Sequence, residues 1–71
     1  MNKDLATEIM AATAKVGAEL NKVSDIIEQI SDIPERTKFR RGIAGLMADI
    51  FIKIERPIIQ EHPELDPDLP S

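Results

Sequence analysis

Apolar residues follow one another at intervals of three or four through the first part of the chain. On a helix that turns about 100° per residue they fall within an arc of roughly 80°. Some of them also repeat every seven residues, which is typical of a seam between packed helices. The spacing predicts a helix over about 3–31. The stripe consists of Leu5, Ile9, Ala12, Val16, Leu20, Val23, Ile27 and Ile30.

A second stripe with the same periodicity follows and fills an arc of about 140°. Asp49 and Lys53 stand four residues apart, in the order that stabilises a helix. The pattern predicts a helix over about 34–55. Pro57 then predicts either a kink or a short further turn at 57–62. The stripe consists of Phe39, Ile43, Leu46, Met47, Ile50, Phe51, Ile54 and Ile58.

The segment between the two stripes carries the signals of a helix start. Ser31 or Asp32 can accept hydrogen bonds from the free amides of a new helix, and Pro34 suits its first turn. Two helices joined by so short a connection lie antiparallel. The fold class is therefore all-α, with a helical hairpin domain over 1–62. Residues 63–71 are acidic and rich in Pro, and this composition predicts a disordered tail.

A hairpin of two helices is a single layer, and its apolar stripes cover each other only in part. The chain has 71 residues and no Cys, and a domain of this size is marginally stable without a disulfide, a metal or a partner. A dimeric four-helix bundle is favoured over docking on a different protein and over a three-helix bundle broken near Gly17. The predicted core is led by Leu5, Ile9, Val16, Leu20, Val23, Ile27, Ile30, Phe39, Ile43, Leu46, Met47, Ile50 and Ile54.

Charge is distributed in blocks along the chain, whose net charge is −4. Arg36, Lys38, Arg40 and Arg41 lie together near the start of the second predicted helix, where the helix dipole disfavours positive charge. Two interpretations remain open. The cluster binds an anion or an acidic partner, or it pairs with acidic residues near the end of the first helix.

Ile52 and Ile59 lie about 100° or more away from the main stripe of the second helix. Isolated surface isoleucines are common, but two on one face favour a contact with a partner. A stripe of Thr7, Ala11, Ala14 and Ala18 on the first helix would allow a second helix to approach closely. The candidate partner-binding residues are Arg36, Lys38, Arg40, Arg41, Ile52 and Ile59.

Nothing in the sequence indicates catalysis. His62 is the only imidazole, and it stands at the start of the predicted tail, where a solvated side chain is expected. No phosphate-binding loop, catalytic motif or metal-ligand spacing occurs, so we expect no enzyme activity, cofactor or metal. No apolar run reaches the ~18 residues needed to span a bilayer, and a cytoplasmic location is expected.

The pattern as a whole indicates a small protein-interaction module, such as an adaptor, regulator, inhibitor or chaperone-like subunit. It would work as a homodimer with a second surface for an unidentified protein partner. One alternative is a regulatory RNA-binding hairpin that uses the Arg36–Arg41 cluster, although the acidic chain and the scarcity of aromatic residues disfavour nucleic acid. Another alternative is a subunit or chaperone of a secretion apparatus.

Overall fold

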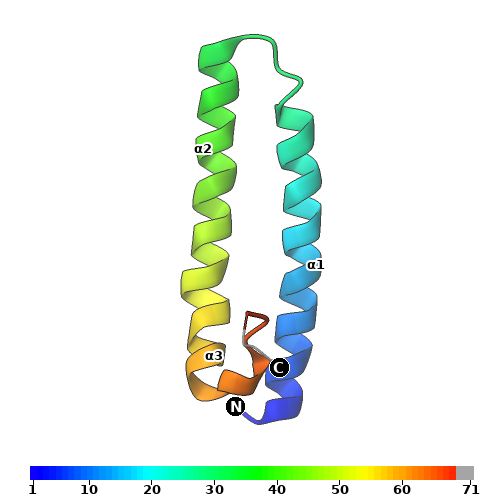
Figure 1. Cartoon of the computed structure of the whole chain (residues 1–71), viewed down its shortest axis with the longest axis vertical. Coiled ribbons are helices and arrows are strands. Elements are labelled where there is room, and N and C mark those ends of the chain that lie inside the picture. Colours follow the sequence, from blue (N-terminus) through cyan, green and yellow to red (C-terminus); the bar gives the residue numbers. More distant parts are fainter. Residues whose placement is uncertain (69–71) are drawn as a thin grey trace.

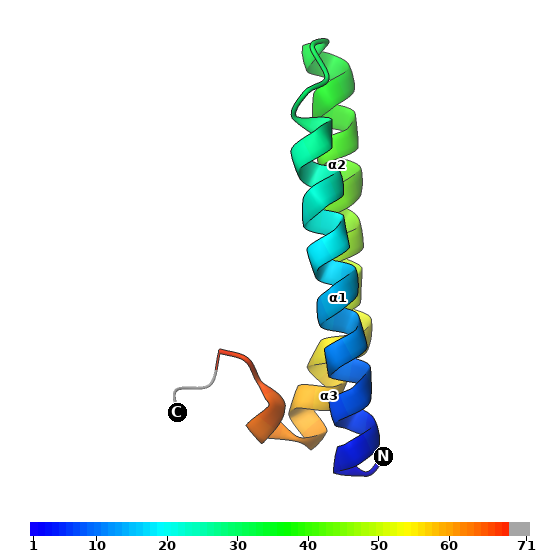
Figure 2. The ribbon, with the colours of Figure 1, turned by 90° about the vertical axis from the view of Figure 1, so that its right-hand side faces the viewer.

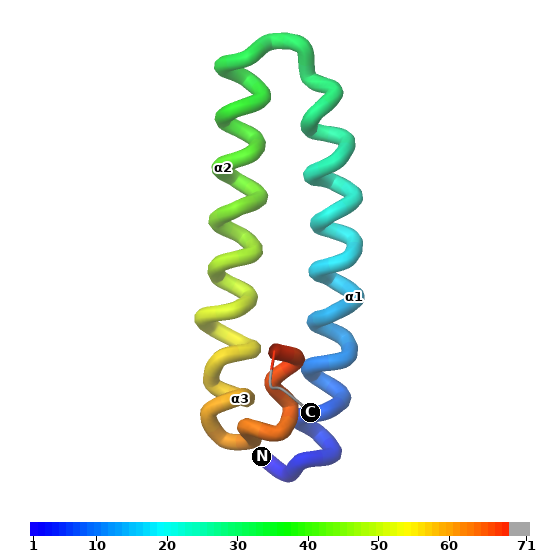
Figure 3. The backbone as a smooth tube through the Cα atoms, in the orientation of Figure 1, coloured from blue at the N-terminus to red at the C-terminus, as the bar shows by residue number. Residues whose placement is uncertain are grey.

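The computed structural model describes residues 1–68, and every regular element in that range is helical. Two long helices, α1 (Lys3–Ile27) and α2 (Ile33–Ile50), lie side by side and run in opposite directions (Figure 1). The backbone tube shows the connection at one end, and the N-terminus and α3 at the other (Figure 3). The two predicted long helices are thus present. Residues 69–71 of the predicted tail lie outside the described residues.

Helix α1 begins and ends through local hydrogen bonds. The side chain of Asn2 accepts a hydrogen bond from the backbone N–H of Leu5 at 2.8 Å, which caps the first turn. The predicted end at residue 31 is wrong, because the helix ends at Ile27. The N–H groups of Gln29 and Ile30 donate to the carbonyls three residues before them. This tighter turn ends α1 and leads into the extended residue Asp32.

Helix α2 starts at Ile33, one residue before the predicted start at residue 34. Asp32 is extended, with φ −72° and ψ 117°, and its carboxylate accepts a hydrogen bond from the N–H of Glu35 at 3.0 Å. Pro34 lies in the first turn, where its missing N–H leaves no hydrogen bond unmade. Since Asp32 must be extended to cap α2, α1 cannot continue into it.

The helix does not stop at Pro57, because a wider turn precedes this residue. Residues Phe51–Glu55 form a π-helical turn, η1, and the N–H of Arg56 donates to the carbonyl of Phe51, five residues back. Helix α3 (Arg56–Glu61) follows directly, with Pro57 in its first turn. In a regular helix the proline ring would clash with the carbonyl four residues before it. Of the two predicted outcomes at 57–62, the structure shows the short further turn.

The C-terminal segment folds back onto the start of α1. Glu61 accepts a hydrogen bond from the N-terminal ammonium of Met1 at 2.6 Å, and Ile58 is only 2% exposed. Residues Pro63–Leu65, predicted as the start of a disordered tail, form a short 3₁₀ helix, η2. The end of the chain opposite the α1–α2 connection is therefore held together by contacts between α3, η2 and α1.

Helices α1 and α2 meet along a seam that is formed on α1 mostly by small side chains. These residues recur at intervals of three or four, and all are buried or half-buried. Within one chain, the predicted core is therefore only partly formed. Six of its members remain exposed: Leu5, Val16, Val23, Phe39, Leu46 and Ile54. The α1 side of the seam consists of Ala6, Met10, Thr13, Gly17, Leu20, Ser24 and Ile27.

The cap of α2 gives the first testable prediction. Replacing Asp32 with Ala should lower the free energy of unfolding by about 1 kcal/mol, because an N–H at the start of α2 loses its acceptor. Asp32→Asn is the matched control, since an amide oxygen caps as well as a carboxylate does. Urea denaturation followed by circular dichroism measures both. Equal stability of the Ala and Asn variants would contradict a capping role.

Candidate protein-interaction surface

A row of large apolar side chains runs along one side of the two long helices, outside the seam. Five of its six members expose between 42% and 52% of their surface, and Ile9 is half-buried. Isolated exposed apolar residues are ordinary, but a contiguous row is not. We call this surface the apolar face. It consists of Leu5, Ile9, Val16 and Val23 on α1 and Phe39 and Leu46 on α2.

Helix geometry places these residues on the same side of the helix pair. On both helices each member of the apolar face directly precedes a residue directed at the other helix; thus Val16 precedes Gly17, and Leu46 precedes Met47. Successive residues are rotated by about 100°. Because the helices are antiparallel, a step of one residue back from the seam rotates toward the same side of the pair on α1 and on α2. The apolar face is therefore continuous across α1 and α2.

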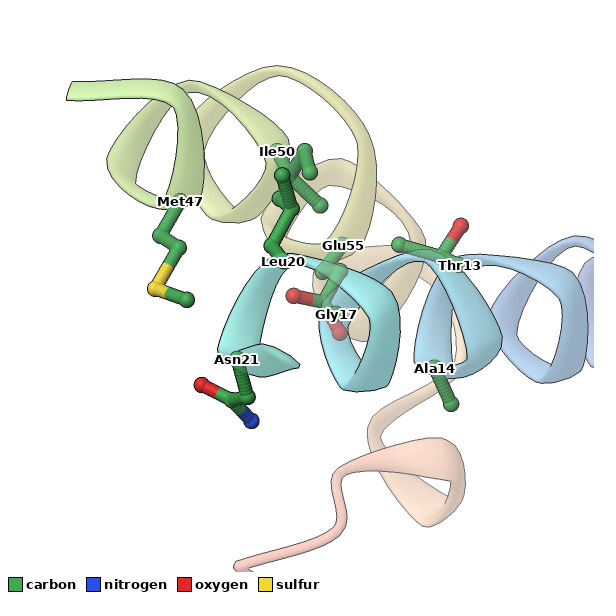
Figure 4. A pocket seen from close by; sticks show the side chains of 8 residues that line it. All are labelled: Thr13, Ala14, Gly17, Leu20, Asn21, Met47, Ile50 and Glu55. Carbon is green, nitrogen blue, oxygen red and sulfur yellow. The ribbon is translucent and has the colours of Figure 1, made fainter. Parts of the chain in front are cut away.

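The C-terminal segment leaves this face uncovered. In the side view, α3 and residues 62–68 project to one side of the long helices only (Figure 2). In the close-up, Ala14 and Asn21 point toward that same side (Figure 4). These two residues follow the seam positions Thr13 and Leu20, so they lie opposite the apolar face. The chain thus covers one side of its helix pair at the open end and exposes the other.

The shape of the chain shows how much surface remains uncovered. The accessible surface is 5396 Å² for a mass of 7.9 kDa, whereas a folded monomer of this mass typically exposes about 4,400 Å². The radius of gyration is 14.9 Å, against about 11 Å for a compact domain of this length. The excess of about 1,000 Å² is similar to the ~800 Å² that each partner buries in a standard protein interface.

The basic cluster near the start of α2 is partly occupied within the chain. The guanidinium of Arg40 forms two hydrogen bonds to the carboxylate of Glu28, and an N–H of Arg36 donates to the carbonyl of Ile30 at 3.3 Å. Lys38 and Arg41 are exposed. The structure therefore brings two of the four predicted residues to the end of α1, and leaves the other two free to meet solvent or a partner.

The other two predicted partner-binding residues, Ile52 and Ile59, differ in exposure. Ile52 lies within this turn and is 53% exposed, whereas Ile59 in α3 is half-buried. The extra residue in the turn rotates all that follows, so Ile52 and Ile59 do not share one exposed face. His62 is not a solvated tail residue, because its side chain is 16% exposed and its Nε2 lies 3.0 Å from the carbonyl oxygen of Met1.

A hollow of about 180 Å³ opens between the long helices where Gly17 has no side chain (Figure 4). Leu20, Met47 and Ile50 form its apolar wall, and Glu55 is placed at its edge by the π-helical turn. The hydroxyl of Thr13 donates to the carbonyl of Ile9 at 2.7 Å. Glu55 is the one carboxylate among the lining residues and the rest of the lining is neutral and mostly apolar, so the hollow has the composition of a packing gap.

Within residues 1–68, no helix is both long enough and apolar enough to cross a membrane. The same residues contain no group of three or more His, Asp or Glu side chains placed to hold a metal ion. Comparison of the chain with protein-family models, curated proteins and solved structures finds no match. The function must therefore be argued from the surfaces described above.

Sequence reasoning missed the small-residue seam, the hollow at Gly17 and the contacts of His62. The seam did leave a signal, since Ala6, Thr13, Leu20 and Ile27 repeat every seven residues. Met10, Gly17 and Ser24 fall between them at the same interval. The larger side chains of the apolar face, such as Val16 and Val23, give a stronger hydrophobic pattern and conceal the seam. The His62 contact joins residues 61 positions apart, and no local pattern predicts it.

The ion pair between the helices gives a prediction about pH. The hydrogen bonds from Arg40 hold the pKa of Glu28 below its ordinary value of 4.5. A carboxyl with a lowered pKa in the folded state stabilises that state above pH 4.5 and loses this contribution as the pH falls through the folded pKa. Urea unfolding between pH 7 and pH 3 should therefore show a shallower loss of stability for Glu28→Gln than for the unmodified chain.

The matched control for this measurement is Glu8→Gln, which neutralises an exposed carboxyl that forms no ion pair within residues 1–68. It should follow the pH profile of the unmodified chain more closely than Glu28→Gln does. Indistinguishable profiles for the two variants would show that the Glu28–Arg40 pair contributes nothing to the acid sensitivity of the fold.

The hollow gives a prediction about stability. A Cβ atom added at Gly17 would meet no atom within 4 Å, and Gly inside a helix costs about 0.5–1 kcal/mol relative to Ala. Gly17→Ala should therefore raise the free energy of unfolding by about that amount, measured by urea denaturation. A destabilised Gly17→Ala variant would show instead that the seam needs the missing side chain in order to close.

Proposed function

We propose that this chain is a small non-catalytic protein-interaction module, of the adaptor, regulator, inhibitor or chaperone-like kind, that works as a homodimer. Two hairpins pair through their apolar faces to form a four-helix bundle. The observation that carries this proposal is the apolar face itself, a row from Leu5 to Val23 on α1 and from Phe39 to Leu46 on α2 that residues 1–68 leave largely exposed.

A second copy is the occupant that fits this face best. Leucine, valine, isoleucine and phenylalanine side chains on both sides give an interface that is chemically matched to itself. Burial of about 800 Å² by each copy would remove most of the excess surface of the single chain. Each helix of the bundle then has two neighbouring helices, and both of its apolar rows are covered.

A second surface remains on the outside of such a dimer. Ile52, Lys38 and Arg41 are exposed, and none of them belongs to the apolar face or to the seam. An exposed isoleucine and two cationic side chains suit an acidic protein surface with an apolar contact point. We assign this outer side of α2 to a different protein partner, which the dimer would present in two copies.

The test compares substitutions at two residues that are equally exposed and lie only six positions apart in the sequence. Leu46 is 52% exposed on the apolar face, and Ile52 is 53% exposed outside it. Leu46→Lys should raise the dissociation constant of the dimer at least tenfold, about 1.4 kcal/mol, because a charge enters the interface. Ile52→Lys should leave self-association unchanged. Sedimentation equilibrium over a range of concentrations measures both.

Two results would overturn the proposal. One is a chain that sediments as a 7.9 kDa monomer at every concentration and still melts cooperatively. The other is a dimer that Leu46→Lys weakens no more than Ile52→Lys does. Loss of helicity together with loss of the dimer in Leu46→Lys supports the proposal, since it shows that the single hairpin depends on its partner.

A further inference from the structure

The two ends of the hairpin differ strongly in charge. Leu20 of α1 and Met47 of α2 line the same hollow, and they mark the level that divides the helices into two halves. The half that contains the α1–α2 connection, residues 20–47, has five basic and four acidic side chains, a net charge of +1. The open half, made of all the other residues, has a net charge of −5.

This asymmetry distinguishes the two ways in which two hairpins can stack through one face. If the two connections lie at the same end, the open halves lie together and have a combined net charge of −10. If the connections lie at opposite ends, each half of +1 lies against a half of −5. The Debye length is about 8 Å at physiological salt and about 30 Å at 0.01 M, so these interactions are strongest at low salt.

We infer that the two copies stack antiparallel, with their connections at opposite ends and the two-fold axis perpendicular to the helices. This inference rests on the proposed dimer and adds its geometry. Each weakly basic end, with Lys38 and Arg41, lies beside the acidic open end of the other copy. Charge complementarity thereby selects one of two arrangements that the apolar contact alone allows.

The apolar face is compatible with this symmetry. Ile9, Val16 and Val23 are spaced by seven residues on α1. A two-fold axis near Val16 lays α1 antiparallel on α1 of the second copy. It brings Val16 close to its own equivalent and Ile9 close to the Val23 of the other chain. On α1, aliphatic side chains of similar size therefore meet along the contact.

The absence of Cys from the chain allows single spin labels to test the arrangement. Ser31 lies in the connection and Gln60 in α3, and both are exposed. In the antiparallel dimer, labels on two Ser31→Cys copies should be separated by a distance close to the 46 Å length of the molecule. Mixed dimers of Ser31→Cys and Gln60→Cys should give a distance well below 46 Å, because the two labels then lie at the same end of the bundle.

The stacking with both connections at one end predicts the reverse: a short distance between two Ser31 labels and a long one in the mixed dimers. That result overturns the inferred orientation and leaves the proposed dimer intact. Absence of any distance between labels at concentrations where sedimentation also finds monomer overturns the proposed function itself. The two failures are therefore distinguishable.

Two double variants of identical net charge provide an independent readout. Lys38→Glu with Arg41→Glu changes the connection half from +1 to −3, and Lys15→Glu with Arg56→Glu changes the open half from −5 to −9. Both chains carry −8 in total. In the antiparallel dimer, the first variant should raise the dissociation constant several-fold at low salt, and the second should leave it unchanged or lower it.

The difference between the two variants should vanish at 1 M salt, where the Debye length is about 3 Å. Circular dichroism of each variant checks that the helices persist. A larger loss of affinity for the variant with the more acidic open half would overturn the antiparallel arrangement, because that result requires the two open halves to lie together.

Discussion

The structure depends on the fact that each long helix has one neighbour but two rows of side chains that need covering. On α1 the row turned toward α2 is the smaller one, with Ala6, Thr13 and Gly17. These side chains leave the seam unfilled at Gly17, where a hollow of about 180 Å³ opens. The larger β-branched side chains, such as Val16 and Val23, are left on the outside. The exposed apolar face follows directly from this choice of seam, and so does the elongated shape.

Local signals were sufficient to predict most of the fold. The Asp32 cap and Pro34 gave the start of α2 to within one residue, because capping depends on a few neighbouring atoms. The end of α1 was predicted too late, since the tightened turn after Ile27 competes with continued helix. The helix continued through Pro57 because a π-helical turn absorbed the proline, and no single-residue preference predicts where an extra residue will be inserted.

Features of the candidate surfaces that depend on neighbouring residues were predictable, and those that depend on contacts between distant residues were not. Ile52 is exposed, as a helical wheel indicates, but Ile59 lies beyond the π-helical turn and loses the predicted phase. Pairing of the basic cluster with the end of α1 was one of two open interpretations, and the contact of Arg40 with Glu28 shows it in part. The burial of His62 depends on a contact across the whole chain, with Met1. Which of two apolar rows forms the seam depends on contacts between residues far apart in the chain, and hydrophobic strength alone does not reveal it.

The placement of α3 and η2 on the side away from the apolar face has a consequence for how the module presents itself. A partner bound to that face would leave α3 and η2 outside the contact. In a pair of hairpins the two segments, each bearing Glu64, Asp66 and Asp68, would project outward from opposite sides. Such a pair would present two identical acidic segments. A binding protein with two suitably spaced basic sites would bind both segments at once and more tightly than either alone.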